Sequence, residues 1–206
     1  MTQTLYYFHD PMCSWCWGFE PVWQEVRENL PDDLALEYIV GGLAPDNDQP
    51  MPEEMQLKLQ HTWQRIQDSI PGTRFNFEFW TDCQPRRSTY PSCRAVLAAK
   101  NLAPEKEQAM ISAIQYAYYL QATNPSDVDV LLQCAITIGL EKESFVTQLQ
   151  SKEVEQQLLE NIARYKQYSS AGFPSLVLKT ETNHHPIGID YNNASIILSQ
   201  LNASRE

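Results

Sequence analysis

The feature that most restricts the fold of this chain is a strand–helix–strand pattern at its beginning. Residues Thr4–His9, T-L-Y-Y-F-H, form a short aromatic and apolar run that is typical of a buried strand. Apolar residues then recur about every 3.6 positions from about Cys13 to Leu30, which predicts a helix that ends before Pro31. A second apolar run, Leu34–Val40, predicts another strand. Together these elements predict a parallel, right-handed βαβ unit.

The middle of the chain has a different character, because helical patterns replace strand patterns. Helical periodicity is expected at residues 52–70, 91–101, 104–121, 127–138 and 142–168. Residues 74–80, R-F-N-F-E-F-W, alternate like a strand, although a loop packed by aromatic side chains is an equal alternative. We therefore expect residues 45–169 to form an all-helical insertion.

The chain returns to strand patterns near its end. Residues 175–180 predict a strand, residues 186–189 its return strand and residues 192–201 an amphipathic helix. Residues 1–44 and 170–206 should therefore form one domain, from which the helical insertion of residues 45–169 projects. The expected fold is α/β, with βαβ and ββα halves that form a mixed four-stranded sheet with helices on both faces.

Charge and composition restrict the partners of the chain. The 206 residues have a net charge of -11 and contain no run rich in Lys or Arg, so we expect no nucleic acid and no anionic membrane as partner. No apolar stretch is long enough to span a membrane. The first residues, M-T-Q-T-L-Y-Y-F-H-D, lack the basic and apolar parts of a secretory signal, so we expect a cytoplasmic protein.

Two cysteines lie where the first strand gives way to the first helix, in the run M-C-S-W-C-W. The helix N-terminus should favour a thiolate at Cys13, and Cys16, one turn later on the same face, is close enough to form a disulfide with it. We expect Cys13 to be the exposed attacking sulfur and Cys16 the more buried resolving sulfur. Two packed structural cysteines or a zinc site are alternatives. A zinc site usually needs a second C-x-x-C pair, which the chain lacks, so we expect no metal.

The run F-H-D-P-M-C-S-W-C-W-G-F, followed by Pro21, resembles the thioredoxin superfamily. A helical insertion between the two halves of the fold resembles the DsbA-like branch, and the run itself looks like the cytoplasmic FrnE-like, DSBA oxidoreductase-like members. The resemblance implies a thioredoxin-like fold with Cys13 as the nucleophile and Cys16 as the resolving thiol. It also implies that Pro174 is the cis-proline that faces the cysteines, and that the backbone of Phe173 meets an extended partner peptide.

The implied activity is thiol–disulfide exchange with protein or low-molecular-weight thiol substrates, in which a thiolate attacks a disulfide and the second cysteine resolves the mixed disulfide. No tightly bound cofactor is implied, and glutathione could serve as a redox co-substrate. Two alternatives stay open. One is a glutathione-dependent isomerase or transferase, similar to 2-hydroxychromene-2-carboxylate isomerases and kappa-class glutathione transferases, which typically have a serine at the head of the helix. The other is a non-catalytic partner-binding protein.

Two departures from the family pattern lie next to the cysteines. The dipeptide between them is Ser14-Trp15, with neither the Pro-His of DsbA nor the Gly-Pro of thioredoxin. The residue before Pro174 is a bulky Phe173, where Val, Ile or Thr is expected. We expect Trp15 at the surface of the active site and Trp17 in the core.

Several other polar or reactive residues have two interpretations each. His9 could stabilise a thiolate when protonated, or it could simply be packed. Asp10 could cap the turn that follows it. Cys83 and Cys93 could form a second redox pair or two independent thiols, while Cys134 is expected to be a buried small hydrophobe. The neighbouring Arg86 and Arg87 could bind a carboxylate of glutathione or form a solvated face.

Overall fold

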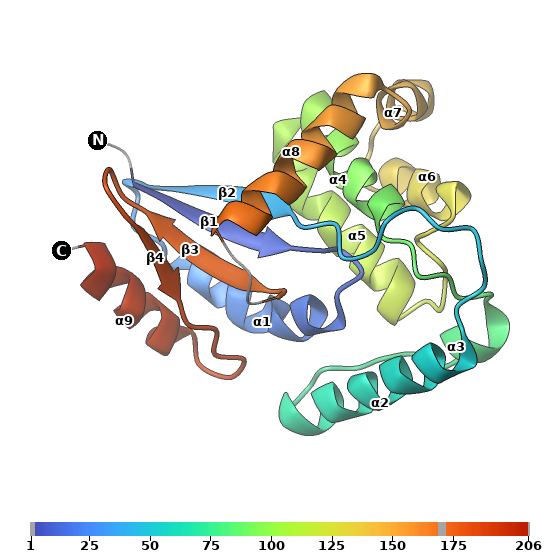
Figure 1. Cartoon of the computed structure of the whole chain (residues 1–206), viewed down its shortest axis with the longest axis horizontal. Coiled ribbons are helices and arrows are strands. Elements are labelled where there is room, and N and C mark those ends of the chain that lie inside the picture. The colour runs from blue at the N-terminus through green and yellow to red at the C-terminus, as the bar shows by residue number, and fades with distance from the viewer. Residues whose placement is uncertain (1–2, 169–171, 206) are drawn as a thin grey trace.

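The computed structural model of the chain describes residues 3–168 and 172–205 (Figure 1). Four strands form one sheet with the order β2-β1-β3-β4. They are β1 (Gln3–His9), β2 (Leu34–Val40), β3 (Ser175–Lys179) and β4 (His184–Ile187). Strands β1 and β2 are parallel, whereas β3 is antiparallel to both β1 and β4. The predicted mixed four-stranded sheet of a thioredoxin-like fold is therefore confirmed.

Helices cover both faces of the sheet, since successive side chains of β1 point to opposite faces and each face is apolar. Leu5 and Tyr7 pack with residues of α1 (Ser14–Glu28) and α9 (Ala194–Arg205). Tyr6 and Phe8 point to the other face, where they meet residues of α8 (Lys152–Tyr168). Figure 1 shows α8 on one side of the sheet and α1 and α9 on the other. This arrangement places the beginning of α1 at one end of the sheet.

The remaining helices lie between β2 and β3 in the sequence, as the insertion requires. They are α2 (Glu53–Ser69), α3 (Phe79–Asp82), α4 (Tyr90–Leu102), the short 3-10 helix η1 (Pro104–Lys106), α5 (Glu107–Tyr119), α6 (Val128–Thr137) and α7 (Lys142–Leu149). Helices α4 to α8 share one apolar core. A second cluster, centred on Trp63 of α2, packs aromatic side chains next to the beginning of α1.

Two expectations about the insertion are corrected by the structure. The helical pattern at residues 142–168 is two helices, because Ser151 interrupts it and its hydroxyl accepts a hydrogen bond from the Val154 N–H at 3.1 Å, which starts α8. Residues 74–80 form no strand. Residues 74–78 form the aromatic loop of the alternative prediction, in which Phe75 stacks on Trp63 with ring centroids 4.8 Å apart, and Phe79 and Trp80 begin α3. The predicted domain boundary between residues 169 and 170 lies outside the described residues.

Candidate active site

Cys13 occupies the N-cap position of α1. Its backbone is extended, with φ -82° and ψ 115°, and its carbonyl accepts the first helical hydrogen bond, from the Trp17 N–H at 3.1 Å. The Cys13 N–H donates to the carbonyl of Asp10 at 3.0 Å, which closes the turn between β1 and the helix. No acidic residue lies in the first turn of α1, so the positive end of the helix dipole faces Cys13 without a competing carboxylate from that turn.

Cys16 lies one turn into α1 and has no solvent-exposed surface. Desolvation, followed by a hydrogen bond with the Cys13 thiol, raises the pKa of Cys16 well above its usual value. Cys13 is more accessible than Cys16, but the expectation that it is exposed is wrong, because only 7% of its surface is exposed and the residue is buried. Of the two cysteines, only Cys13 lines the cleft described below, and Cys16 is enclosed by the protein.

Phe173 and Pro174 lie opposite Cys13, and the peptide bond between them is cis. The Cys13 thiol donates a hydrogen bond to the Phe173 carbonyl at 3.5 Å. The Phe173 ring packs on Tyr165, with centroids 4.3 Å apart, and lies over Gly41, where a Cβ atom would overlap it. The absence of a side chain at Gly41 explains how this bulky ring fits beside the cysteine pair.

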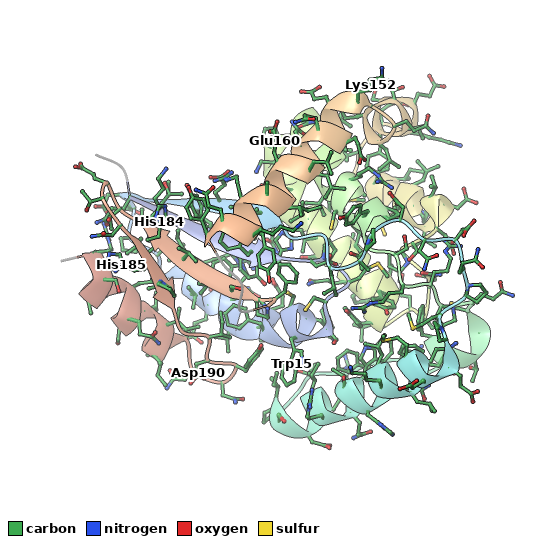
Figure 2. The ribbon with its side chains drawn as sticks, viewed as in Figure 1. Trp15, Lys152, Glu160, His184, His185 and Asp190 are labelled. Carbon is green, nitrogen blue, oxygen red and sulfur yellow. The ribbon has the colours of Figure 1, made fainter. Side chains whose placement is uncertain are left out.

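A cleft of about 290 Å³ opens above Cys13. Its walls come from the start of α1, the loop after β2, helix α2, the loop before α4 and the segment before β3, and include Trp15, Leu43, Thr62, Trp63, Arg86, Arg87, Thr89 and Phe173. Trp15 lies between the beginning of α1 and helix α2 (Figure 2). There the guanidinium of Arg65 lies 5.4 Å from the centre of its ring, and Tyr191 packs beside it. The cleft is thus a mixed aromatic and cationic groove that reaches the sulfur.

His9 lies inside the protein and is 1% exposed. Burial, together with the charge of Lys100, lowers the pKa of His9 from 6.5 to about 3. Its ring stacks on Tyr7 with centroids 5.3 Å apart, and neither ring nitrogen has a hydrogen-bond partner in the described structure. At neutral pH the ring is therefore uncharged, which favours the packed interpretation over a cation that stabilises a thiolate.

The other cysteines have separate surroundings. Cys83 donates to the Ala122 carbonyl at 3.0 Å, whereas Cys93 is fully buried with its thiol 3.5 Å from Asp10 Oδ2. These different partners favour two independent thiols over a second redox pair. Cys134 is 6% exposed, as expected of a small hydrophobe.

In the ranges 3–168 and 172–205, no group of three or more His, Cys, Asp or Glu side chains is placed to hold a metal ion.

The neighbouring tryptophans and arginines also differ from one another. Trp17 is only partly buried and donates to the Arg74 carbonyl at 3.0 Å, while it stacks on Tyr119.

Arg86 lines the cleft, and its guanidinium donates a hydrogen bond to the Ser126 carbonyl at 2.9 Å. Arg87 also lines the cleft, and no hydrogen bond or ion pair of its side chain is found among the described residues.

Known proteins share the fold of this chain. The model of the DSBA-like thioredoxin domain family matches residues 4–190. A Nitrosomonas europaea protein with a provisional assignment as a protein disulfide isomerase has a structure similar to this one, with a TM-score of 0.87, 29% sequence identity, and coverage of 98% of this chain and 97% of that chain. The cytosolic disulfide reductase DsbM of Pseudomonas aeruginosa has a TM-score of 0.79 and 22% identity over 98% of both chains. DsbM is also known in a structure with glutathione.

Curated relatives are more distant. The ClpXP adapter protein SpxH of Halalkalibacterium halodurans is 25% identical over 152 residues, which are 72% of this chain and 49% of that protein. SpxH of Bacillus subtilis is 25% identical over 149 residues, 72% of this chain and 48% of that protein. The chain therefore spans about half the length of these curated relatives.

No helix in the described part of the chain is long and apolar enough to cross a membrane.

Proposed function

Because this chain belongs to the DSBA-like thioredoxin domain family, we propose that it is a thiol–disulfide oxidoreductase that uses the Cys13-Ser-Trp-Cys16 pair. One observation carries the proposal: the Cys13 sulfur lies at the helix N-terminus, 3.5 Å from the Phe173 carbonyl and at the floor of a cleft. A disulfide that enters this cleft meets Cys13 first, and Cys16 lies behind it.

The proposed reaction has two steps. The Cys13 thiolate attacks one sulfur of a substrate disulfide, which forms a mixed disulfide and releases the other substrate sulfur as a thiolate that takes up a proton. Cys16 then loses its proton and attacks Cys13, which forms the Cys13–Cys16 disulfide and releases the second substrate thiol. The substrate gains two electrons and two protons, and the protein loses them. The reverse sequence oxidises a dithiol.

Substrate binding is proposed to use the walls of the cleft. The backbone of Phe173 would meet an extended peptide, while the exposed face of Trp15 would pack against its side chains. Arg87 lies in the same cleft and would attract a carboxylate. A thiol such as glutathione, present in a structure of DsbM, could therefore return the pair to its reduced state. A reducing, cytoplasmic location is part of this proposal.

Three cysteine variants test the proposal. The assay follows reduction of a disulfide-linked peptide by glutathione, coupled to glutathione reductase. Cys13→Ser should lower the rate by at least about 1,000-fold, because it removes the nucleophile. Cys16→Ser should stop turnover but accumulate a mixed disulfide on Cys13, which mass spectrometry would detect. Cys134→Ser, at a cysteine that does not line the cleft, is the matched control and should keep full activity.

Two results would contradict the proposal in different ways. Full activity in Cys13→Ser would remove any role of this sulfur and favour a partner-binding protein. Full turnover in Cys16→Ser, with glutathione attached to Cys13, would favour the glutathione-dependent alternative over the dithiol mechanism.

A further inference from the structure

Asp10 is a fully buried carboxylate that takes no direct part in the proposed exchange. Its Oδ1 atom accepts a hydrogen bond from the Met12 N–H at 2.9 Å. Its Oδ2 atom accepts hydrogen bonds from the Leu43 N–H at 2.7 Å, the Thr89 hydroxyl at 2.7 Å and the Cys93 thiol at 3.5 Å. Four donors fit an ionised carboxylate, which is an acceptor only. Burial raises the pKa of Asp10 above its usual value, and these hydrogen bonds oppose that shift.

These donors connect three separate walls of the cleft. Met12 directly precedes Cys13, Leu43 follows β2, and Thr89 is the N-cap of α4. All three residues line the cleft. The Thr89 hydroxyl also accepts a hydrogen bond from the Ala44 N–H at 3.0 Å, which extends the network along the loop after β2. The carboxylate therefore joins three walls of the cleft next to the residue that precedes Cys13.

Asp10 is joined to the beginning of α1 by its backbone and by its side chain. Its carbonyl accepts a hydrogen bond from the Cys13 N–H at 3.0 Å, and its Oδ1 atom accepts one from the N–H of Met12, the residue before Cys13. Burial and the neighbouring Cys13 are the larger causes of the raised pKa of Cys16, and the negative charge of the Asp10 carboxylate adds to them. Within residues 3–168 and 172–205, Asp10 forms no salt bridge, so no cation neutralises this charge by direct contact.

We propose that Asp10 is a positioning residue whose buried charge makes the Cys13–Cys16 pair a stronger reductant of disulfides. The inference rests on the proposed oxidoreductase function. The reduced pair can carry a thiolate, whereas its disulfide is uncharged, so a fixed negative charge beside the sulfurs favours the disulfide form. The reduced pair then gives two electrons and two protons to a substrate disulfide. Two molecules of a monothiol such as glutathione return them and become oxidised.

The equilibrium of the full chain with reduced and oxidised glutathione tests this role. Asp10→Asn keeps the shape of the side chain but removes its charge. It should lower the equilibrium constant for oxidation of the pair about tenfold, which corresponds to about 30 mV towards a less negative potential. Thr89→Val is the matched control, because it removes one hydrogen bond to the carboxylate and keeps the charge. Its equilibrium constant should not fall.

The outcomes separate this inference from the proposed function. An unchanged equilibrium in Asp10→Asn, or an equal fall in Thr89→Val, would overturn the role of the charge, even though the pair forms its disulfide normally. If the unaltered chain forms no Cys13–Cys16 disulfide at any glutathione ratio, the proposed function itself fails. Should Asp10→Asn not fold, Asp10→Ser also removes the charge, and the same fall in the equilibrium constant is expected of it.

Discussion

At the residue scale, Gly41 determines how closely Phe173 can approach the cysteine pair. The φ of Gly41 is not positive, so its backbone conformation does not explain why glycine stands there. The space explains it, because a Cβ atom at this position would overlap the Phe173 ring. The bulky residue before Pro174 is therefore matched by a missing side chain on the neighbouring loop.

A substitution at this contact should affect stability and activity together. Gly41→Ala should lower the free energy of unfolding by about 1–3 kcal/mol, because the ring must move out of a packed site. It should also slow disulfide reduction, because the Phe173 carbonyl would shift away from Cys13. Urea unfolding and the glutathione-coupled assay would measure both effects. The double variant Gly41→Ala/Phe173→Val restores the space, so a double variant as unstable as the single one would refute this explanation.

At the element scale, the sequence patterns predict the elements of the sheet well, because their signals are local. The aromatic run at β1, the helical periodicity of α1 and the apolar run at β2 all correspond to elements of the structure within a few residues. The sequence pattern does not separate α7 from α8, because the local signal between them is a single serine cap at Ser151. Contacts between segments, such as those of Asp10 with Leu43 and Thr89, have no local signal at all.

Helices α1 and α2 approach closely at Gly18, and this contact positions one wall of the cleft. A Cβ atom at Gly18 would lie 2.8 Å from Ile70 Cδ1 and 3.0 Å from Ile66 Cγ2. Gly18→Val should therefore push α2 outwards and lower the free energy of unfolding by about 1–3 kcal/mol.

Since α2 carries Thr62 and Trp63 of the cleft, Gly18→Val should also raise KM for a disulfide peptide more than it lowers kcat. The measurement is steady-state kinetics beside urea unfolding. Glu25→Val, on the exposed face of α1, is the control for helix propensity and should leave KM unchanged. An unchanged KM in Gly18→Val would mean that α2 does not shape the substrate site.

At the scale of the whole molecule, the buried His9 should make the fold sensitive to mild acid. The pKa of His9 is about 3 in the folded protein, below its ordinary value of 6.5. At a pH between these two values, the unfolded chain therefore binds a proton at His9 and the folded chain does not. Stability is therefore complete above pH 6.5 and falls as the pH decreases. Between pH 7.5 and 5.5 this one group should lower the free energy of unfolding by about 1.4 kcal/mol.

The test is urea unfolding at these two pH values, with two histidine variants. His9→Phe keeps an aromatic ring against Tyr7 but cannot bind a proton, so its stability should change less with pH than that of the unaltered chain by about this amount. His61→Phe, at an exposed site on α2, is the control for a change from histidine to phenylalanine as such. If His9→Phe showed the same loss as the unaltered chain, another group would control the acid sensitivity.

The measurement that tests the central claim most directly is a redox titration of the purified chain in glutathione buffers. Alkylation of the free thiols and mass mapping of the peptides would locate each disulfide. We predict one reversible disulfide, between Cys13 and Cys16, while Cys83, Cys93 and Cys134 stay reduced. If Cys13 and Cys16 remain free at every glutathione ratio, or if only a glutathione adduct forms on Cys13, the dithiol mechanism is wrong.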